Sequence, residues 1–371
     1  MKIGISTFWQ TKDNYGQILQ CWALQQALIK QGHAPFLIRY TGVGLSRKPP
    51  INFVKKVKKI IKNLPKYYQL WRMLQMQQQY NQQTDNAKRE FEAFKNQELR
   101  ISAKIYDAGS IHQTPPEADL YICGSDQIWG DDSYYYLDFV PNKKKKIAYA
   151  VSMGADFLQQ DSEFKAWMQN LIKDFSSLGM REDVGVKACQ ELGRADAKVV
   201  VDPTMLLMRH DYELIRQSSG LIQKYLFLYI IGNPIDLRIE EVYTYARKVG
   251  LEVVYVAVQG QCDSYPKAFP KIGEWLDLID NAELVVTNSF HGTVFSLIYE
   301  TPFVVVPAKK FLSSKNIRIE QLLSNTSLSH RMYSESVEKT VNSSCDFQGF
   351  RSFVEMSRQE AYQFLSTSIS Y

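Results

Sequence analysis

The 371-residue sequence lacks the signatures of several common protein classes. Its five cysteines are scattered and contain no C-x-x-C pair, which suggests neither a zinc knuckle nor a redox dithiol and fits a reducing compartment. No apolar run approaches the roughly 20 residues of a membrane span. The amino-terminal MKIGISTFWQ has no apolar stretch of signal-peptide length and predicts a first strand. We therefore expect a cytoplasmic protein without a metal centre.

Acidic side chains are absent from residues 14–84. Eleven Lys and Arg residues fall there, and because the whole chain carries +5, the remainder sums to −6. Positive charge is thus confined to one stretch without an RNA or DNA motif, which argues against nucleic-acid binding. Within residues 47–72, INFVKKVKKIIKNL predicts a basic amphipathic helix. Such a helix favours peripheral contact with an anionic membrane on its inner face, although a helix packed on the protein or a solvated charge run explains the same pattern.

The rest of the sequence alternates short apolar runs with longer amphipathic ones. Strand-like runs include KIGISTF, APFLIRY and ADLYICG early on, and YLFLYII, AELVVTN and PFVVV later, with helical patterns between them. This alternation predicts an α/β protein with parallel sheets and helices on both faces, and the length suits two domains. We predict a first domain over residues 1–205 with a basic insertion at about 46–98, a second over 206–345, and a terminal helix over 346–371.

Ligands of open α/β sheets bind beyond the carboxyl ends of the strands, so residues that follow strands are the candidate site residues. After the first strand come Asp13, Asn14, Tyr15 and Gly16. The glycine allows a ligand to approach the backbone closely, and the N–H groups of the next helix suit hydroxyl or anionic oxygens. A helix cap made by Asp13 or Asn14 explains the same stretch about equally well.

Two further strand ends carry polar residues. Ser125, Asp126 and Trp129 follow ADLYICG, where a turn exposes oxygens and the indole suits stacking on a sugar ring, although Gly-Ser-Asp is also a common turn. Arg181 follows SSLGM, a good position for gripping phosphate or carboxylate with its planar fork. An ion pair between Arg181 and Glu182 or another acid is the structural alternative.

The most informative motif is NSFHG, residues 288–292, between the strand AELVVTN and the helix VFSLIYE. His291 falls at or just before the helix N-terminus, where unsatisfied N–H groups carry about half a positive charge. Ser289, Gly292 and Thr293 surround it, a setting that suits a phosphate and a protonated imidazole able to act as a general acid. A histidine that caps its own helix or packs in a wall is the alternative.

Seven segments, in order along the chain, resemble the polysaccharide pyruvyl transferase family: NYGQILQCWALQQAL, DLYICGSDQIW, AVSMGA, GMREDVGVK, VVDPTMLL, AELVVTNSFHGTVFSLIYETPFVVV and RIEQLL. They extend from residue 14 to about 323, and TNSFHG is the most specific. The resemblance implies a glycosyltransferase-B-like fold of two Rossmann-like halves facing across a cleft, with the terminal helix returning to the first. It also implies phosphoenolpyruvate as donor and a cyclic pyruvate ketal on a sugar as product.

The resemblance places the family's donor-binding basic residue at Arg181 and its histidine at His291. Some members have an arginine two residues before that histidine, where this sequence has Ser289, so we expect Lys315 or Arg318 to substitute. The expected donor site therefore comprises Arg181, Ser289, Gly292, Thr293, Lys315 and Arg318, with His291 protonating the methylene carbon. The acceptor, a lipid-linked oligosaccharide, is expected against the first half, at Asp13, Asn14, Tyr15, Gly16, Ser125 and Trp129. Asp126 is the expected base for its hydroxyl, with Asp13 as the alternative. No cofactor is expected.

Two other functions fit parts of the sequence. A nucleotide-sugar-dependent glycosyltransferase of the same architecture should show a base-reading pocket and an acidic ribose ligand in the second half, and neither is evident. A non-catalytic membrane-docking relative is favoured by the basic stretch, but not by the combination of NSFHG with Arg181 and Arg318.

Overall fold

The computed structural model describes residues 1–42, 86–141, 143–153, 157, 160–231, 237–258, 263–308 and 316–370. The segment 47–72, most of the expected basic insertion, and Lys315 lie outside these residues, so membrane contact and a donor role for Lys315 stay predictions. Within the part of the chain that is described, no helix has the length and apolar character needed to cross a membrane.

The first half is a parallel sheet of seven strands in the order β3-β2-β1-β4-β5-β6-β7. Its strands are β1 (Lys2–Ser6), β2 (Ala34–Tyr40), β3 (Ile101–Tyr106), β4 (Leu120–Cys123), β5 (Lys145–Val151), β6 (Ser177–Met180) and β7 (Lys198–Val199). Its helices are α1 (Tyr15–Lys30), α4 (Phe91–Glu98), α5 (Ser110–Gln113), α6 (Ser162–Ile172) and α7 (Asp183–Glu191). The order reverses between β1 and β4, so a crevice at the carboxyl ends opens there.

Helix α1 shows how the sequence sets these elements. The Asn14 side chain accepts a hydrogen bond from the Gln17 N–H at 3.3 Å, which caps the first turn. The helix ends after Lys30, and Gly32 adopts a φ of +82° that few other residues tolerate. Its Ile18, Leu19 and neighbouring apolar residues are fully buried, so the helix is held between the sheet and the second half.

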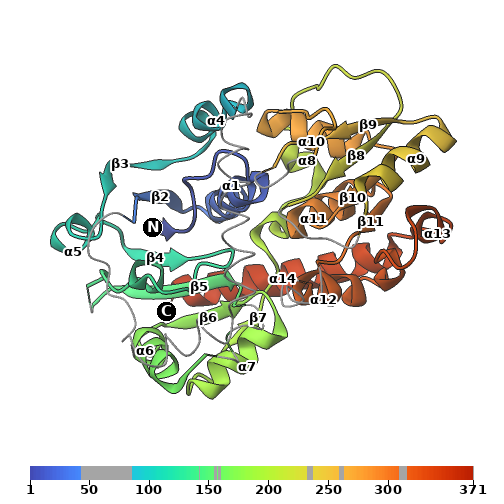
Figure 1. The fold of residues 1–371 in the computed structure, drawn as a ribbon. Coiled ribbons are helices and arrows are strands. Elements are labelled where there is room, and N and C mark those ends of the chain that lie inside the picture. The colour runs from blue at the N-terminus through green and yellow to red at the C-terminus, as the bar shows by residue number, and fades with distance from the viewer. Residues whose placement is uncertain are drawn as a thin grey trace, which may run out of the picture.

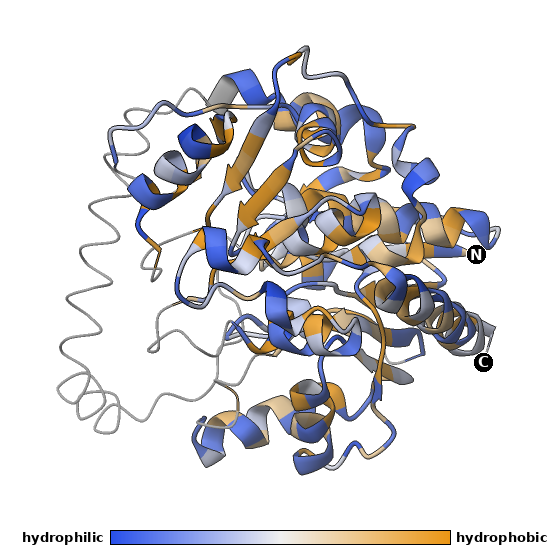
Figure 2. Cartoon of the chain, turned by 90° about the vertical axis from the view of Figure 1, so that its right-hand side faces the viewer, coloured by the Kyte–Doolittle hydropathy of each residue, from blue (hydrophilic) through white to orange (hydrophobic). Residues whose placement is uncertain are grey.

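The second half is a smaller parallel sheet in the order β11-β10-β8-β9. Its strands are β8 (Tyr225–Tyr229), β9 (Glu252–Tyr255), β10 (Leu284–Thr287) and β11 (Phe303–Val305). Its helices are α8 (Arg209–Tyr212), α9 (Ile239–Val249), α10 (Ile272–Asp280), α11 (Phe290–Tyr299), α12 (Ile317–Asn325) and α13 (Val337–Val341). Strands β8, β10 and β11 are buried along their whole length. Figure 2 shows hydrophobic strands in orange beside helices that carry hydrophilic residues in blue.

The two halves meet through an apolar joint. Tyr15 of α1 is fully buried and stacks on Trp275 of α10, with ring centroids 5.1 Å apart. Its hydroxyl donates to the carbonyl of Pro270 at 2.7 Å. One continuous cluster of buried apolar residues runs from the first sheet through this joint into the second. The halves therefore pack directly against each other beside the site described below.

The last helix, α14 (Gln348–Ser370), crosses from the second half back to the first (Figure 1). It contacts α12 near its start, and further on Gln31 donates to Ser366 Oγ at 2.9 Å. Phe364 packs on Tyr149 of β5, and Lys145 Nζ donates to the carbonyl of Ile369 at 3.3 Å. The expected return of the terminal helix is thus confirmed.

The two-domain α/β fold is confirmed, and the exact domain boundaries stay predictions. The two sheets are separated by residues 200–224, which contain the short 3₁₀ helix η4 (Pro203–Leu206) and α8. The expected boundary at residue 205 falls inside η4, which contacts α1 in the first half and α11 in the second. Strand β3 had no clear sequence signal, because the edge strand ISAKIY exposes three consecutive side chains and does not alternate cleanly.

Candidate functional site: a buried charge cluster between the halves

Arg181 lies at the carboxyl end of β6, directly before α7, and its side chain is almost fully buried. Its Nη1 donates to Asp202 Oδ2 at 2.9 Å and its Nε donates to Glu182 Oε1 at 3.1 Å. Burial lowers the pKa of the guanidinium, but the carboxylates of Glu182 and Asp202 outweigh burial and raise it. The ion pair with Glu182, which the sequence offered as the structural alternative, is therefore present, with a second acid added.

Asp202 is the centre of the cluster, and sequence analysis did not assign it a role. It follows β7 and caps η4, because its Oδ1 accepts from the Thr204 N–H at 3.0 Å and from the Thr204 hydroxyl at 2.7 Å. Its Oδ2 lies 3.0 Å from Ser125 Oγ, 2.9 Å from Arg181 Nη1 and 3.6 Å from His291 Nε2. Burial raises the pKa of this carboxyl, but His291 and Arg181 outweigh burial and lower it strongly, so Asp202 is an anion.

His291 enters the cluster from the second half, in the first turn of α11, and is 7% exposed. Its Nε2 faces Asp202, while its Nδ1 lies so close to Gly16 that a Cβ on that residue would overlap the imidazole. Gly16 is therefore needed for the approach of α1 to α11, and its predicted role in acceptor binding stays a prediction. The two halves place the histidine jointly.

Arg318 of α12 is the second arginine of the cluster. Its Nη1 lies 4.0 Å from Asp126 Oδ1, and Arg181 Nη2 lies 3.8 Å from the same oxygen. Both guanidinium groups lie over the ring of Phe290, at 4.4 Å for Arg181 and 5.9 Å for Arg318. Burial first, and then repulsion by Arg181, lowers the pKa of Arg318. The predicted residues Arg181, Arg318, His291 and Asp126 are thus brought together.

Three buried nitrogens of this cluster have no hydrogen-bond partner among the described residues: Arg181 Nη2, Arg318 Nε and His291 Nε2. Buried polar groups are nearly always paired in folded proteins, so a group of unpaired donors marks a place where a ligand or water completes the bonding. Because two of the three belong to guanidinium groups, the ligand chemistry that fits best is a carboxylate or phosphate.

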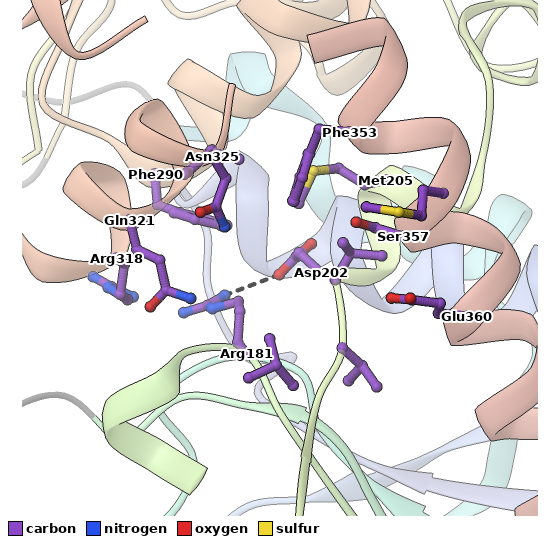
Figure 3. Close-up of a pocket in the computed structure, with 15 residues that line it drawn as sticks. Arg181, Asp202, Met205, Phe290, Arg318, Gln321, Asn325, Phe353, Ser357 and Glu360 are labelled. Atoms are coloured by element: carbon purple, nitrogen blue, oxygen red, sulfur yellow. Dashed lines mark hydrogen bonds and ion pairs between the residues drawn. The ribbon is translucent and has the colours of Figure 1, made fainter. Parts of the chain in front are cut away.

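A cavity of about 420 Å³ opens beside the two arginines. Figure 3 shows Arg318, Gln321 and Arg181 on one side of it, with Ser357 and Glu360 of α14 on the other. Phe290 lines the cavity, whereas its neighbour His291 does not, since the imidazole lies toward Asp202 and Gly16. The cavity is large enough for a small organic anion.

The predicted helix N-terminus is already engaged in its own bonds. Ser289 Oγ accepts from the Gly292 N–H at 3.2 Å, and the Ser289 carbonyl accepts from the Thr293 N–H at 2.9 Å and from the Thr293 hydroxyl at 3.0 Å. Ser289 is therefore the N-cap of α11. Donor binding by Ser289, Gly292 and Thr293 stays a prediction, and it requires these bonds to be exchanged for bonds to the ligand.

The expected acceptor residues are dispersed. Asn14 caps α1, the Asp13 N–H and carboxylate both lie near the Thr11 hydroxyl, and Tyr15 is buried in the joint between the halves. Trp129 packs in the core, stacked on Tyr136 at 5.3 Å and donating to the Tyr135 carbonyl at 3.2 Å. None of these positions offers an open aromatic face, so their acceptor role stays a prediction that the packing does not favour.

Ser125 and Asp126 do lie at the cluster. The Ser125 N–H donates to Gln20 Oε1 at 3.0 Å, and the Thr7 hydroxyl donates to the Ser125 carbonyl at 3.0 Å, which fixes this loop to α1 and to the end of β1. Asp126 adopts a φ of +82° and turns its carboxylate toward the two arginines. Its expected role as the acceptor's base stays a prediction.

Sequence reasoning missed Asp202, although the Asp-Pro pair at the end of the strand AKVVVD is a helix-cap signal that could have identified it.

No group of three or more His, Cys, Asp or Glu residues arranged to hold a metal ion occurs within the described ranges. Of the cluster, Arg181, Asp202 and Arg318 line the cavity and His291 does not.

The sequence and the fold were compared with those of known proteins. No curated protein matches the sequence. In three dimensions the chain is similar to the UDP-GlcNAc 2-epimerase from Methanocaldococcus jannaschii, with 10% identity, coverage of 96% of this chain and 92% of that one, and a TM-score of 0.52. A Listeria monocytogenes protein provisionally named as a UDP-N-acetylglucosamine 2-epimerase gives 10% identity, coverage of 97% and 90%, and a TM-score of 0.51. At such identities the likeness shows the fold alone, a glycosyltransferase-B-like pair of Rossmann-like halves.

The model of one sequence family, polysaccharide pyruvyl transferase, matches residues 14–309. The match covers most of the chain and includes α1, the Asp126 loop, Arg181, Asp202 and the NSFHG motif. Six of the seven segments that suggested the family lie within the match, and the seventh, RIEQLL with Arg318, lies beyond it. The chain belongs to the polysaccharide pyruvyl transferase family.

Proposed function

We propose that this protein transfers the enolpyruvyl unit of phosphoenolpyruvate to a hexose of a polysaccharide precursor, forms a cyclic pyruvate ketal and releases phosphate. The observation that carries the proposal is the pair of buried arginines, Arg181 and Arg318, which lie beside a cavity of about 420 Å³. Each has an N–H group without a hydrogen-bond partner among the residues that the structure describes. Phosphoenolpyruvate has two anionic groups, a carboxylate and a phosphate, and two guanidinium groups match them in chemistry.

In the proposed reaction, the His291 imidazolium turns from Asp202, which it faces in this structure, toward the cavity and delivers a proton to the methylene carbon of the donor. Carbon 2 becomes oxocarbenium-like and one sugar hydroxyl adds to it with loss of its proton. A second hydroxyl of the same sugar then displaces phosphate and closes the ketal, and its proton leaves with the phosphate or the base. The negative charge of Asp202, 3.6 Å from His291 Nε2, supports the positive imidazole, and the two arginines stabilise charge on the departing phosphate.

Asp202 acts in this scheme as a positioning residue. Its Oδ2 holds Arg181 from one half and faces His291 from the other, so the acid and the donor-binding arginine share one support. Asp126 is the proposed base for the first hydroxyl because its carboxylate adjoins both arginines and is less buried than Asp202.

The test measures phosphate release and product mass with phosphoenolpyruvate and a panel of aryl and lipid-linked hexosides. Acceptor-dependent phosphate release with a product heavier by one pyruvyl ketal is the expected result. Sugar transfer from UDP-GlcNAc in place of pyruvyl transfer would overturn the proposal in favour of a nucleotide-sugar glycosyltransferase. Donor binding is measured separately as the shift in melting temperature with phosphoenolpyruvate, UDP or GDP. A shift with UDP or GDP and none with phosphoenolpyruvate would also overturn the proposal.

The acid role has its own test. His291→Asn removes the proton donor without adding volume, so turnover should fall by about 10²–10⁴-fold while donor binding persists. A folded His291→Asn protein that retains near-full turnover would contradict the assignment. His330→Asn is the matched control, because that histidine contacts only the Ser344 carbonyl at the surface among the bonds that the structure shows.

A further inference from the structure

A second space of about 520 Å³ adjoins the cavity beside the two arginines, and the two share Val199, Val200 and Glu360 as lining residues. The second space is lined by the ends of β6 and β7 and by α14 as far as Thr367 and Ser368. Together they form one groove between the last strand of the first sheet and the last helix of the chain, which we call the α14 groove.

The local sequence explains why this groove exists. Strand β7 is only two residues long and is the terminal strand of its sheet, so its outer edge has no partner strand in the described chain. Along α14, residues 353, 356, 360, 363 and 367 recur at intervals of three and four, which places them on one face of the helix. Val199 is 44% exposed, so that face leaves the edge strand uncovered.

The chemistry of the lining changes along the groove. Near the arginines the wall is apolar, with Phe353 and Met356, the latter 57% exposed. Farther out it presents Glu360, Gln363 and Thr367, all exposed side chains that can bond hydroxyl groups. Asp196 and Glu360 are partly balanced by Lys198, so the outer part carries no excess of positive charge.

We propose that the α14 groove binds the acceptor as an oligosaccharide, with the reacting sugar beside Arg181 and Arg318 and the following sugars along α14. Sugar hydroxyl groups can exchange hydrogen bonds with the polar side chains of the groove, and the C–H faces of the sugar rings can pack on Phe353, Met356 and Val199. An anionic polymer is disfavoured by Asp196 and Glu360. A partner helix is disfavoured because the outer wall lacks a continuous apolar stripe.

The groove has room for several sugars. From Phe353 to Thr367 the α14 axis advances about 21 Å at about 1.5 Å per residue. This inference rests on the proposed function for the identity of the reacting end, but the saccharide site itself does not depend on the donor. It also moves the acceptor away from Tyr15 and Trp129, which are packed in the core.

The test obstructs the outer groove without touching the charge cluster. Gln363→Trp places an indole on the exposed, groove-facing side of α14, and Gln359→Trp places the same indole on an exposed position of α14 that does not line either cavity. Neither glutamine side chain makes a hydrogen bond that the structure shows, so both variants should fold, which thermal unfolding checks.

Two readouts separate the failure of this inference from the failure of the proposed function. The first is kcat/KM for pyruvyl transfer to hexose oligosaccharides from mono- to hexasaccharide. The second is the binding affinity of these oligosaccharides, β-linked glucose and galactose series, measured by saturation-transfer NMR without any donor. In Gln363→Trp the ratio of hexasaccharide to monosaccharide kcat/KM should fall about tenfold and hexasaccharide binding should weaken in parallel, while Gln359→Trp retains both.

Length-dependent saccharide binding that Gln363→Trp weakens, without any pyruvyl transfer, would sustain the α14 groove and sink the donor assignment. Normal pyruvyl transfer with equal length dependence in wild type, Gln363→Trp and Gln359→Trp would overturn the groove and leave the proposed function standing. Saccharide binding to none of the proteins, or to all of them equally, would also overturn the groove.

Discussion

The strand ends of the first sheet fall into two groups that look alike in sequence and differ in structure. After β6 and β7, Arg181 and Asp202 are buried in a charge cluster with donors left unpaired. After β1 and β4, Tyr15 and Trp129 are equally buried, but they stack on Trp275 and Tyr136 and complete apolar packing. The position of a residue after a strand therefore predicts that it lies near the cleft. Buried polar atoms without hydrogen-bond partners are what distinguish a candidate ligand site from a packed joint between the halves.

The largest expected effect is on the charge cluster. Asp202→Ala leaves the buried Arg181 and His291 without their shared carboxylate, and losing one partner of a buried pair typically costs about 3–5 kcal/mol of unfolding free energy. Urea unfolding measures it. The control is Asp196→Ala, which breaks a 2.7 Å pair with Arg194 in which the carboxylate is 54% exposed, and should cost under about 1 kcal/mol. Equal losses in the two variants would show that burial does not set the energetics of this cluster.

The next effect tests how closely the halves must approach. Gly16→Ala places a methyl group against the His291 imidazole, so it should separate α1 from α11 and cost about 1–3 kcal/mol, with a larger fractional loss of turnover than of stability. Gly130→Ala is the control, because a Cβ there meets nothing within 4 Å. Chemical denaturation and turnover of both variants give the answer. Unchanged turnover in Gly16→Ala would mean that the imidazole position is not critical.

The pH dependence sharpens the contrast between the two groups. Burial raises the pKa of Asp202, but His291 and Arg181 outweigh burial and lower it, so folding stability from this carboxyl is present above the unfolded-state pKa of about 3.9 and is lost as pH falls below it. Unfolding free energy measured between pH 3 and pH 5 should fall more steeply in wild type than in Asp202→Asn. Parallel profiles would contradict the depressed pKa.

The smallest expected effect on turnover lies in the joint. Tyr15→Phe keeps the ring stacked on Trp275 but removes the hydroxyl that donates to the Pro270 carbonyl at 2.7 Å and accepts from Arg89 Nη1 at 3.1 Å, and such a loss costs about 1–3 kcal/mol of unfolding free energy. Turnover should change little because Tyr15 does not line the cavity beside the arginines. A large loss of turnover would show that Tyr15 takes part in the function of the site and would contradict its assignment to the packed residues of the joint.

Much of the fold could be predicted because its signals are local. Alternating apolar and amphipathic runs gave most of the strands and helices, and the Asn14 cap and the Gly32 stop set the ends of α1. The short edge strands β3 and β7 and the place of the domain boundary could not be predicted with the same precision, since they depend on which residues neighbouring elements cover.

The candidate site was predicted unevenly for the same reason. Arg181, Arg318, His291 and Asp126 were expected and lie together, whereas Asp202 and the α14 groove were not foreseen. The phosphate-binding helix terminus is occupied by the Ser289 cap, and the polar-looking turn after β4 sends Trp129 into the core. Sequence patterns show which strands are followed by polar residues. They do not show which of those residues have hydrogen-bond or ion-pair partners in the folded protein.

By itself, the sequence determined the class of the protein: two parallel α/β units, the elements that follow each other, and the family to which the ordered motifs belong. Tertiary structure decided which residues form the site, because burial and pairing are properties of segments far apart in the chain. Arg181 and Asp202 come from two different loops and His291 from the first turn of α11, and Phe353 to Thr367 reach the first sheet only because α14 folds back. Unpaired donors and a continuous groove arise from that assembly, since neither exists until the halves are packed together.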